Sequence, residues 1–278
     1  MNITDFRIPG RLDEARAILK ELGPAGLPLA GATSLEFIPG KDPKTAVDIT
    51  RLGLEGIVRE NGGFRIGAAT RIAALQNHHE PGWVLDRVAV RLASQPIRNM
   101  STIGGNIARV FPWADFPVVL LALNATMVID ETKVPADEYF ASQPARYFKD
   151  GALLTAIHVP AVGARVGFGY RKQTQAAMGF SLMTCAALLE ADGNHIKTAR
   201  VALGAGIPFP ARLQAIEQAL AGKAGGEEIF KAAAAQGLSG LKFKGAAGMS
   251  EEYMAHLAAV VVPDALADAW AAAKGGAR

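Results

Sequence analysis

One stretch of the sequence combines residue types that could hold an anion. In IRNMSTIGGNIARVFPWADFP, residues 97–117, Thr102 and Asn106 flank the adjacent glycines Gly104 and Gly105. A glycine pair is typical of a tight turn, because glycine adopts positive φ without a steric penalty. Glycines also leave backbone amides bare, and a hydroxyl and an amide side chain add hydrogen-bond donors. The segment alone leaves both interpretations open, a turn or an anion-binding loop.

A second stretch of small residues has the same composition. Ala30, Gly31, Ala32, Thr33 and Ser34 follow the apolar residues LPL. Neither stretch fits G-x-x-x-x-G-K-[ST] or G-x-G-x-x-G, so a P-loop and a Rossmann site have no support. Two loops of this kind could each hold one half of a diphosphate, with backbone amides and hydroxyls as donors.

Asp115 follows the glycine segment and allows two interpretations. It lies between Pro112 and Pro117. An acid here could accept a hydrogen bond from a ribose hydroxyl, as acids do in other dinucleotide sites. It could equally cap a helix that begins at residue 116, because Asp is a favoured N-cap.

The remaining reactive side chains form no recognised constellation. The side chains of the adjacent His78 and His79 diverge, and no Cys/His cluster accompanies them in the sequence, so we expect no metal ligand. Cys185 lies in the apolar run SLMTCAALLE, and the sequence has no G-x-S-x-G, so we name no catalytic residue. The run Tyr170-Arg171-Lys172 is either the charged end of a strand or a cationic wall beside a phosphate or cofactor ring.

The composition indicates a globular protein with a sizeable core. Of 278 residues, 50% are hydrophobic and 20% are charged. The formal net charge is only +3 and the basic residues are scattered, so we expect no nucleic-acid partner. The single cysteine excludes an iron–sulfur cluster in this chain, because a cluster takes about four ligands. We see no stretch of ~18 uncharged apolar residues and no secretory signal, so we expect no membrane-spanning segment and a cytoplasmic location.

Periodicity and turn signals predict alternating helices and hairpins. Asn61-Gly62 is a favoured type I′ turn pair, and Pro263 is expected to break or kink the last helix, with the Ala-rich tail after residue 265 fraying. The predicted helices are 11–22, 70–77, 84–94, 211–221, 227–236 and one from 250, and the strands lie around 47–50, 55–69, 152–160 and 166–205.

Mixed hairpins and helices favour an α+β fold over a doubly wound parallel sheet. We expect a small N-terminal α/β lobe over residues 1–55 and a middle α/β lobe over residues 56–160 that carries the glycine segment. A C-terminal domain with an antiparallel sheet and helices would cover residues 161–278.

Taken in order, these segments resemble the FAD-binding (medium) subunits of the molybdenum hydroxylases, the xanthine dehydrogenase family, and most of all the carbon monoxide dehydrogenase type. LPLAGATSL lies where the family commonly has A-G-G-[TQ]-[SD]-L. The segment 97–117 is close to the family's I-R-N-x-[GA]-T-I-G-G-N with its downstream P-x-[AS]-D. LLTAIHVP and YRKQTQAAMGFSL resemble the strand pair that opens the family's C-terminal domain. The resemblance covers nearly the whole chain.

The resemblance implies a vanillyl-alcohol-oxidase-type fold, in which two α/β lobes clasp non-covalently bound FAD. The two small-residue loops would wrap the diphosphate, Asp115 would bind the adenosine part, and Leu154 would be an apolar contact near the flavin or adenine. Lys172 would lie by the isoalloxazine edge and Tyr170 would shield the ring. The implied FAD-binding residues are Ala30, Gly31, Ala32, Thr33, Ser34, Thr102, Ile103, Gly104, Gly105, Asn106, Asp115, Leu154, Tyr170 and Lys172.

Two features depart from the family pattern. Ala32 replaces the usual second glycine of the first loop, so we expect it to adopt ordinary backbone angles or to need slightly more room. The residues Arg109, Val110, Phe111 and Trp113 are bulkier than the small residues expected there. Neither change removes an implied ligand.

The resemblance also implies a function: an oxidoreductase subunit that transfers electrons within a heterotrimer. It would take electrons from the 2Fe-2S clusters of an iron–sulfur subunit onto FAD and pass them to NAD⁺, a quinone or oxygen. The clusters and the molybdenum cofactor would lie in partner subunits only, and the single cysteine fits that division. The alternative is a free-standing FAD-dependent oxidoreductase of the same fold, which would need its own substrate pocket and proton donor.

Overall fold

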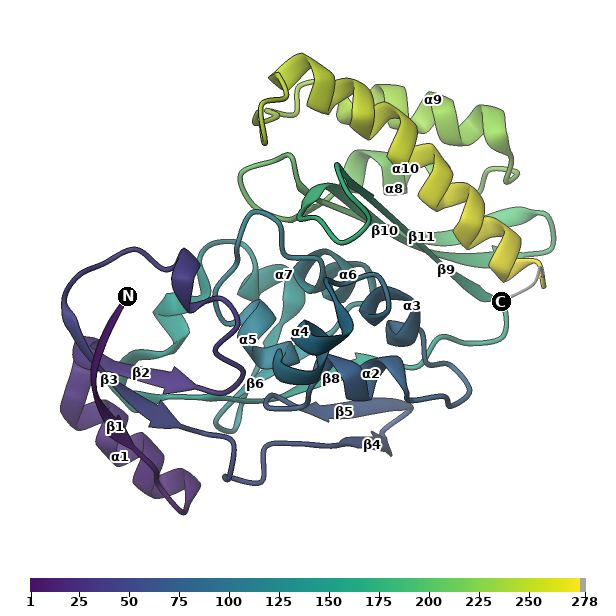
Figure 1. Cartoon of the computed structure of the whole chain (residues 1–278). Coiled ribbons are helices and arrows are strands. Elements are labelled where there is room, and N and C mark those ends of the chain that lie inside the picture. Colours follow the sequence, from purple (N-terminus) through teal and green to yellow (C-terminus); the bar gives the residue numbers. More distant parts are fainter. Residues whose placement is uncertain (276–278) are drawn as a thin grey trace.

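The computed structural model describes residues 1–275, and its N-terminal part is a small parallel sheet beside one helix (Figure 1). The sheet order is β1-β3-β2, with strands Asn2–Arg7, Pro43–Asp48 and Gly26–Leu29. Helix α1, Leu12–Leu22, buries Ala15 and Leu19 on one face, which confirms the predicted helix. Short 3₁₀ turns follow at Gly23–Ala25 and Leu35–Phe37.

The middle part is built on an antiparallel sheet of order β4-β5-β8-β6-β7. Asn61 and Gly62, between β4 and β5, both have positive φ, which confirms the predicted type I′ hairpin. The helices cover a core that includes Phe64, Phe116 and Tyr139. The strands are Ile57–Glu60, Gly63–Gly67, Leu154–Pro160, Thr126–Ile129 and Thr132–Pro135, and the helices are α2 Ile72–Gln76, α3 Leu85–Ala89, α4 Gln95–Met100, α5 Ile103–Ile107, α6 Phe116–Ala122 and α7 Ala136–Tyr139, with 3₁₀ turns at Pro144–Tyr147 and Lys149–Gly151.

Three expectations for this middle part are wrong. The helix expected over residues 84–94 ends at Ala89, and the glycine segment is the short helix α5 rather than a loop. Strand β8 does not open the C-terminal sheet with β9, because it pairs with β5 and β6 in the middle sheet. Its residues are buried almost without interruption, as expected for a central strand.

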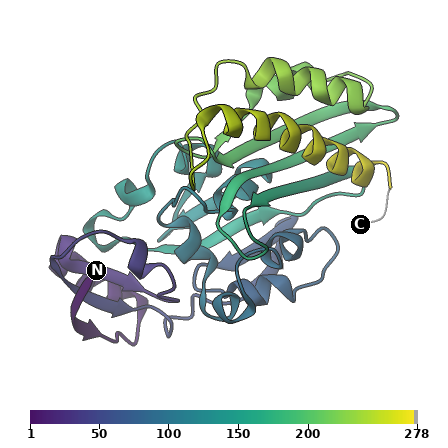
Figure 2. The same ribbon diagram turned by 45° about the horizontal axis from the view of Figure 1, so that its top comes forward.

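The C-terminal part is an antiparallel sheet of order β12-β11-β10-β9, which confirms the predicted meander. Helices α8, α9 and α10 cover one face, and α6 of the middle part lies against β10 and β11 (Figures 1 and 2). The elements are β9 Val166–Thr174, β10 Ser181–Asp192, β11 His195–Ala205, β12 Ala211–Arg212, α8 Gln214–Leu220, α9 Glu227–Leu238 and α10 Glu251–Ala273.

Helix α10 corrects the expectation of a broken and frayed C-terminus. It continues through Pro263 to Ala273, and only residues 276–278 of the tail lie outside the described residues. Gly167 and Gly169 on β9 let the helix approach closely, because a Cβ on either would overlap the backbone of α10. Packing against the sheet therefore holds this tail in place.

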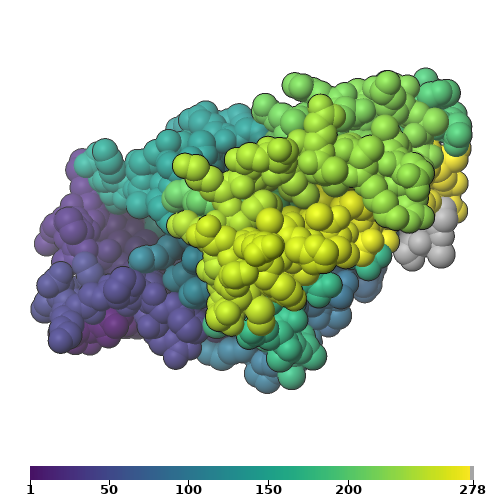
Figure 3. All heavy atoms as spheres, turned by 90° about the horizontal axis from the view of Figure 1, so that it is seen from above, coloured from purple at the N-terminus to yellow at the C-terminus, as the bar shows by residue number. Residues whose placement is uncertain are grey.

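Helix α10 is also long and apolar enough to cross a membrane, by length and composition alone. Its most apolar window is 44% buried inside the protein, and the helix runs along β9 and β10 on the surface seen in Figure 3. A core helix of a soluble protein passes the same composition test, so this property is weak evidence for a membrane span.

The three sheets occupy residues 2–48, 57–160 and 166–212. The middle core also includes Phe168, Tyr170 and Ala186 from the C-terminal sheet. The sheet thus packs on the middle part with one face and on its own helices with the other. The division at about residues 55 and 160 stays a prediction.

Candidate functional site

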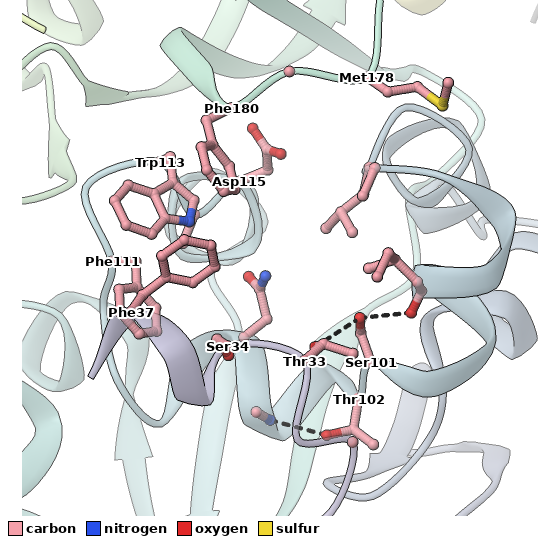
Figure 4. Close-up of a pocket in the computed structure, with 18 of the residues that line it drawn as sticks. Thr33, Ser34, Phe37, Ser101, Thr102, Phe111, Trp113, Asp115, Met178 and Phe180 are labelled. Carbon is pink, nitrogen blue, oxygen red and sulfur yellow. Dashed lines mark hydrogen bonds between the residues drawn. The ribbon is translucent and has the colours of Figure 1, made fainter. Parts of the chain in front are cut away.

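A pocket lies where segments from all three parts of the chain meet (Figure 4). Its volume is ≈ 140 Å³. The first small-residue loop, the segment from α3 to α6 and the β9–β10 connection surround it. The lining residues are Gly31, Ala32, Thr33, Ser34, Phe37, Leu92, Ala93, Ile97, Ser101, Thr102, Gly105, Asn106, Phe111, Trp113, Ala114, Asp115, Lys172, Met178, Gly179 and Phe180.

The loop after β2 supplies free hydrogen-bond donors. Within the described residues, the backbone N–H groups of residues 31–34 donate to no protein acceptor. Gly31 lets the loop lie against the end of α4, because a Cβ there would overlap the carbonyl of Met100. The hydroxyls of Thr33 and Ser101 are 3.1 Å apart and tie the loop to the next segment. Successive unpaired amides in a loop form a concavity that suits an anion.

Ala32 has a left-handed backbone, with φ of 58°. The expectation of ordinary angles at this position is therefore wrong. This backbone region is unfavourable for most residues with a Cβ; glycine adopts it freely, and Asn and Asp adopt it more often than the others. The loop keeps the conformation that a second glycine would adopt, and the alanine bears the strain.

The glycine segment contributes differently from the first loop. Thr102 is the N-cap of α5, and its Oγ1 accepts a hydrogen bond from the N–H of Gly105 at 3.1 Å. The N–H groups of Ile103, Gly104 and Asn106 also have partners, the carbonyls of residues 70, 68 and 102. The expectation of bare amides is therefore wrong for this segment, whose backbone donors are already in use.

The two glycines of this segment serve packing and access rather than positive φ. Neither Gly104 nor Gly105 has a left-handed φ. A Cβ on Gly104 would lie 2.5 Å from the carbonyl oxygen of Ala68, so only glycine fits there. Gly105 faces the pocket, and a Cβ on it would meet only the hydroxyl of Thr102, at 3.0 Å. The turn interpretation, which explained the glycines by positive φ, is therefore wrong. At Gly105 no side chain prevents a ligand from approaching the backbone closely.

Asn106 carries an unsatisfied polar atom at the pocket. Its Oδ1 is buried and has no hydrogen-bond partner within the described residues. A buried polar atom without a partner costs about 1–3 kcal/mol. Such an atom in a pocket wall is suited to a ligand that donates a hydrogen bond.

Asp115 is buried at the far wall of the pocket and holds a polar network together. Its Oδ1 accepts from the hydroxyls of Ser181 at 2.6 Å and Thr184 at 2.8 Å, and its Oδ2 pairs with Lys172 Nζ at 2.7 Å. Both side chains of this ion pair are nearly inaccessible, at 3% and 7%. Asp115 stands at the N-cap position of α6 but makes no capping hydrogen bond, so the capping interpretation is wrong.

Several predicted site residues lie outside the lining. Ile103 and Gly104 are buried residues of α5, and Ala30 is half-buried directly after β2. Leu154 is buried in the core on β8. Tyr170 is buried on β9, where burial and, less strongly, the Asp115 carboxylate raise the pKa of its hydroxyl well above the usual value. The structure brings the other predicted residues together.

Sequence reasoning missed the residues that shape the walls. The guanidinium of Arg98 is buried and donates to the carbonyls of Leu92 and Ala93 at 2.8 and 2.6 Å, which fixes one wall. Phe37 and Phe180 meet Phe111 and Trp113 on the opposite side. No local spacing links these segments, so only the fold reveals the wall.

Comparison with known protein families decides what class of site this is. Residues 2–162 match the FAD-binding domain of molybdopterin dehydrogenases, and residues 168–269 match the C-terminal domain of the CO dehydrogenase flavoprotein. The chain belongs to the FAD-binding subunits of the molybdenum hydroxylases. It is an oxidoreductase subunit with FAD as its cofactor, and the resemblance inferred from the motifs is confirmed.

Individual relatives of this family extend over most of the chain. The carbon monoxide dehydrogenase medium chain of Hydrogenophaga pseudoflava is 28% identical, covering 96% of this chain and 97% of the relative. The glyceraldehyde dehydrogenase medium chain of Sulfolobus acidocaldarius is 31% identical over 73% and 76% of the two chains. The solved carbon monoxide dehydrogenase from Hydrogenophaga pseudoflava that lacks the Mo-pyranopterin moiety superposes with a TM-score of 0.90 at 29% identity, covering 96% of this chain and 97% of the solved one. The predicted α+β FAD-binding fold of this family is thereby confirmed.

The pocket has the hydrogen-bonding groups and the open backbone that a dinucleotide needs. The free amides of residues 31–34 suit a diphosphate, the open face of Gly105 permits close approach, and the orphaned Oδ1 of Asn106 suits a ribose or ring donor. These features lie on one continuous lining. The residues therefore fit FAD.

Proposed function

We propose that this subunit holds FAD in the pocket of Figure 4 and serves as the electron exit of a molybdenum hydroxylase. The first loop would bind the diphosphate through its amides, and the Thr102–Asn106 segment would form the surface beneath it. The observation that carries this placement is the run of four free N–H groups at residues 31–34.

The other predicted contacts follow from their positions around the pocket. Asp115 would bind the adenosine part and Lys172 would lie at the isoalloxazine edge. Both line the pocket, and their ion pair fixes their geometry. Leu154 and Tyr170 would act as an apolar contact and a ring shield, and both lie outside the present lining, so these two assignments require movement of the wall.

When bound, FAD supplies the redox chemistry, accepting electrons and passing them on in pairs. We propose that the electrons come from the 2Fe-2S clusters of an iron–sulfur subunit, with the molybdenum cofactor in a third subunit. NAD⁺, a quinone or oxygen would be the final acceptor. The relatives are named as chains or subunits of larger dehydrogenases, which supports a heterotrimer, and we place the complex in the cytoplasm.

This chain cannot hold the clusters itself. Its one cysteine, Cys185, is fully buried in β10, and burial raises the pKa of its thiol. A cluster needs about four ligands, mostly thiolates. The protein's own part is to bind the cofactor, orient it and set its environment.

The function is tested by the flavin content of the purified chain. Oxidised-flavin absorption, released as FAD on heating, is the expected result, followed by co-purification with iron–sulfur and molybdenum proteins from the native source. A colourless chain that takes up no added FAD, alone or with its partner subunits, would overturn the proposal.

The placement of the site is tested by Asn106→Ala. Because Oδ1 of Asn106 is buried without a partner within the described residues, its removal loses no hydrogen bond and should not destabilise the FAD-free chain. Affinity for FAD should fall about tenfold, the effect of one hydrogen bond. Asn77→Ala makes the same change at an exposed position outside the pocket and serves as the matched control. Equal affinities for the two variants would place FAD elsewhere.

A further inference from the structure

Four aromatic rings from three separate segments form one side of the pocket (Figure 4). Phe37 comes from the turn after the first loop, Phe111 and Trp113 from the connection before α6, and Phe180 from the residues before β10. Phe37 meets Trp113 and Phe180 edge-on, with ring centroids 5.3 Å apart in both cases. The indole of Trp113 is the centre of this cluster.

Two phenyl rings stack on the Trp113 indole. Phe111 stacks at a centroid distance of 5.1 Å and an interplanar angle of 15°, and Phe180 stacks at 4.6 Å and 28°. A planar ligand ring that stacks on Trp113 in place of either phenyl ring must displace that ring.

The two phenyl rings are not equally anchored. Phe180 is 56% exposed, although it stacks on the indole, and its neighbour Met178 is 66% exposed. Phe111 lies in the half-buried connection, and the guanidinium of Arg109 lies over its ring, 5.6 Å from the ring centroid. A stacked aromatic pair adds only a small stabilisation beyond the effect of the area that it buries. Phe180 is thus the ring that a ligand displaces at low cost.

The small accessible volume of the pocket supports such a displacement. Its ≈ 140 Å³ is below the roughly 300–1,000 Å³ of pockets that bury ligands of this size. Phe180 and Trp113 both line it, so removal of the Phe180 ring enlarges the cavity next to the loops proposed for the diphosphate.

We propose that Trp113 is the stacking platform for a planar ring of the bound dinucleotide, and that Phe180 holds this place until the ring displaces it. The inference rests on the proposed binding of FAD in this pocket. Phe180 is therefore a positioning residue that competes with the cofactor, and Trp113 contacts the cofactor directly. The bulky residues in the segment 109–113 thus acquire a specific role in ring recognition.

The competition is tested with the full chain after removal of flavin, by stopped-flow measurement of FAD uptake. Phe180→Ala should bind FAD about fivefold faster and more tightly than the unaltered chain, because the binding-competent fraction rises. Phe209→Ala is the matched control, since it removes a partly exposed phenyl ring that lies outside the pocket. Phe180→Leu keeps apolar bulk without a flat ring, so its rate and affinity of FAD binding should lie between those of Phe180→Ala and the unaltered chain.

The platform is tested by tryptophan fluorescence. Trp113→Phe should abolish the part of the quenching that FAD causes at this site, leaving Trp83 and Trp270 as the remaining tryptophans. FMN and ADP identify the ring: quenching of Trp113 by FMN alone assigns the isoalloxazine, and quenching by ADP alone assigns the adenine.

The outcomes separate this inference from the proposed function. Suppose that the purified chain holds FAD but that Phe180→Ala binds FAD neither faster nor more tightly than the unaltered chain. The competition by Phe180 is then refuted, and the FAD site stands. If neither FMN nor ADP quenches Trp113 while FAD binds, the platform is refuted. If no form of the chain takes up FAD, with or without its partner subunits, the proposed function fails as well.

Discussion

Replacing Ala32 by glycine should stabilise the protein. Ala32 has φ of 58°, a region that costs residues with a Cβ about 1–2 kcal/mol. Glycine removes this strain but adds about 0.4–1 kcal/mol of chain entropy to the unfolded state. The mid-range values give a net gain of about 0.8 kcal/mol in the free energy of unfolding for Ala32→Gly.

The assay is urea unfolding of the FAD-free chain, because bound cofactor would add its own stabilisation. Ala164→Gly is the matched control. Ala164 is an exposed turn residue without a positive φ, so glycine there brings only the entropic loss and should destabilise by about 0.4–1 kcal/mol. The two substitutions should therefore shift the unfolding midpoint in opposite directions. A midpoint for Ala32→Gly at or below that of the unaltered chain would refute the strain argument.

Three further predictions concern the glycine segment, the buried ion pair and the cysteine. Gly104→Ala should destabilise the FAD-free chain by about 1–3 kcal/mol in urea unfolding, because its Cβ overlaps backbone, whereas Gly105→Ala should fold normally and weaken FAD binding in a titration. In the same urea assay, Asp115→Asn should lower the free energy of unfolding by about 3–5 kcal/mol, because it leaves the Lys172 ammonium buried without its counter-ion. Adding Lys172→Met to this variant should restore much of the lost stability. Cys185 should resist a thiol reagent from pH 7 to 9 and react only on unfolding, since burial raises its pKa; rapid labelling of the native chain would contradict this.

Local patterns were sufficient for some of the regular elements of the fold. The apolar spacing of residues 11–22 specifies α1, and Asn61-Gly62 specifies its hairpin, because each signal acts between near neighbours in the sequence. The same holds for the strand pattern of the C-terminal meander. Where the expectations failed, a distant contact prevailed. Helix α10 continues past Pro263 because β9 packs against it, and β8 joins the middle sheet because β5 and β6 accept it as a partner.

By itself, the sequence determined the family, the two small-residue segments and the separation of this subunit from cluster-binding chains, because these depend on motif identity and a cysteine count. Only the tertiary structure decided what each glycine does. Gly31 and Gly104 are needed where carbonyls from other segments approach, whereas Gly105 leaves a face open to the pocket. The stacking of Phe180 on Trp113 likewise joins residues from different segments. A one-dimensional pattern records residue types and spacings, and these contacts exist only once the chain has brought distant backbone and rings together.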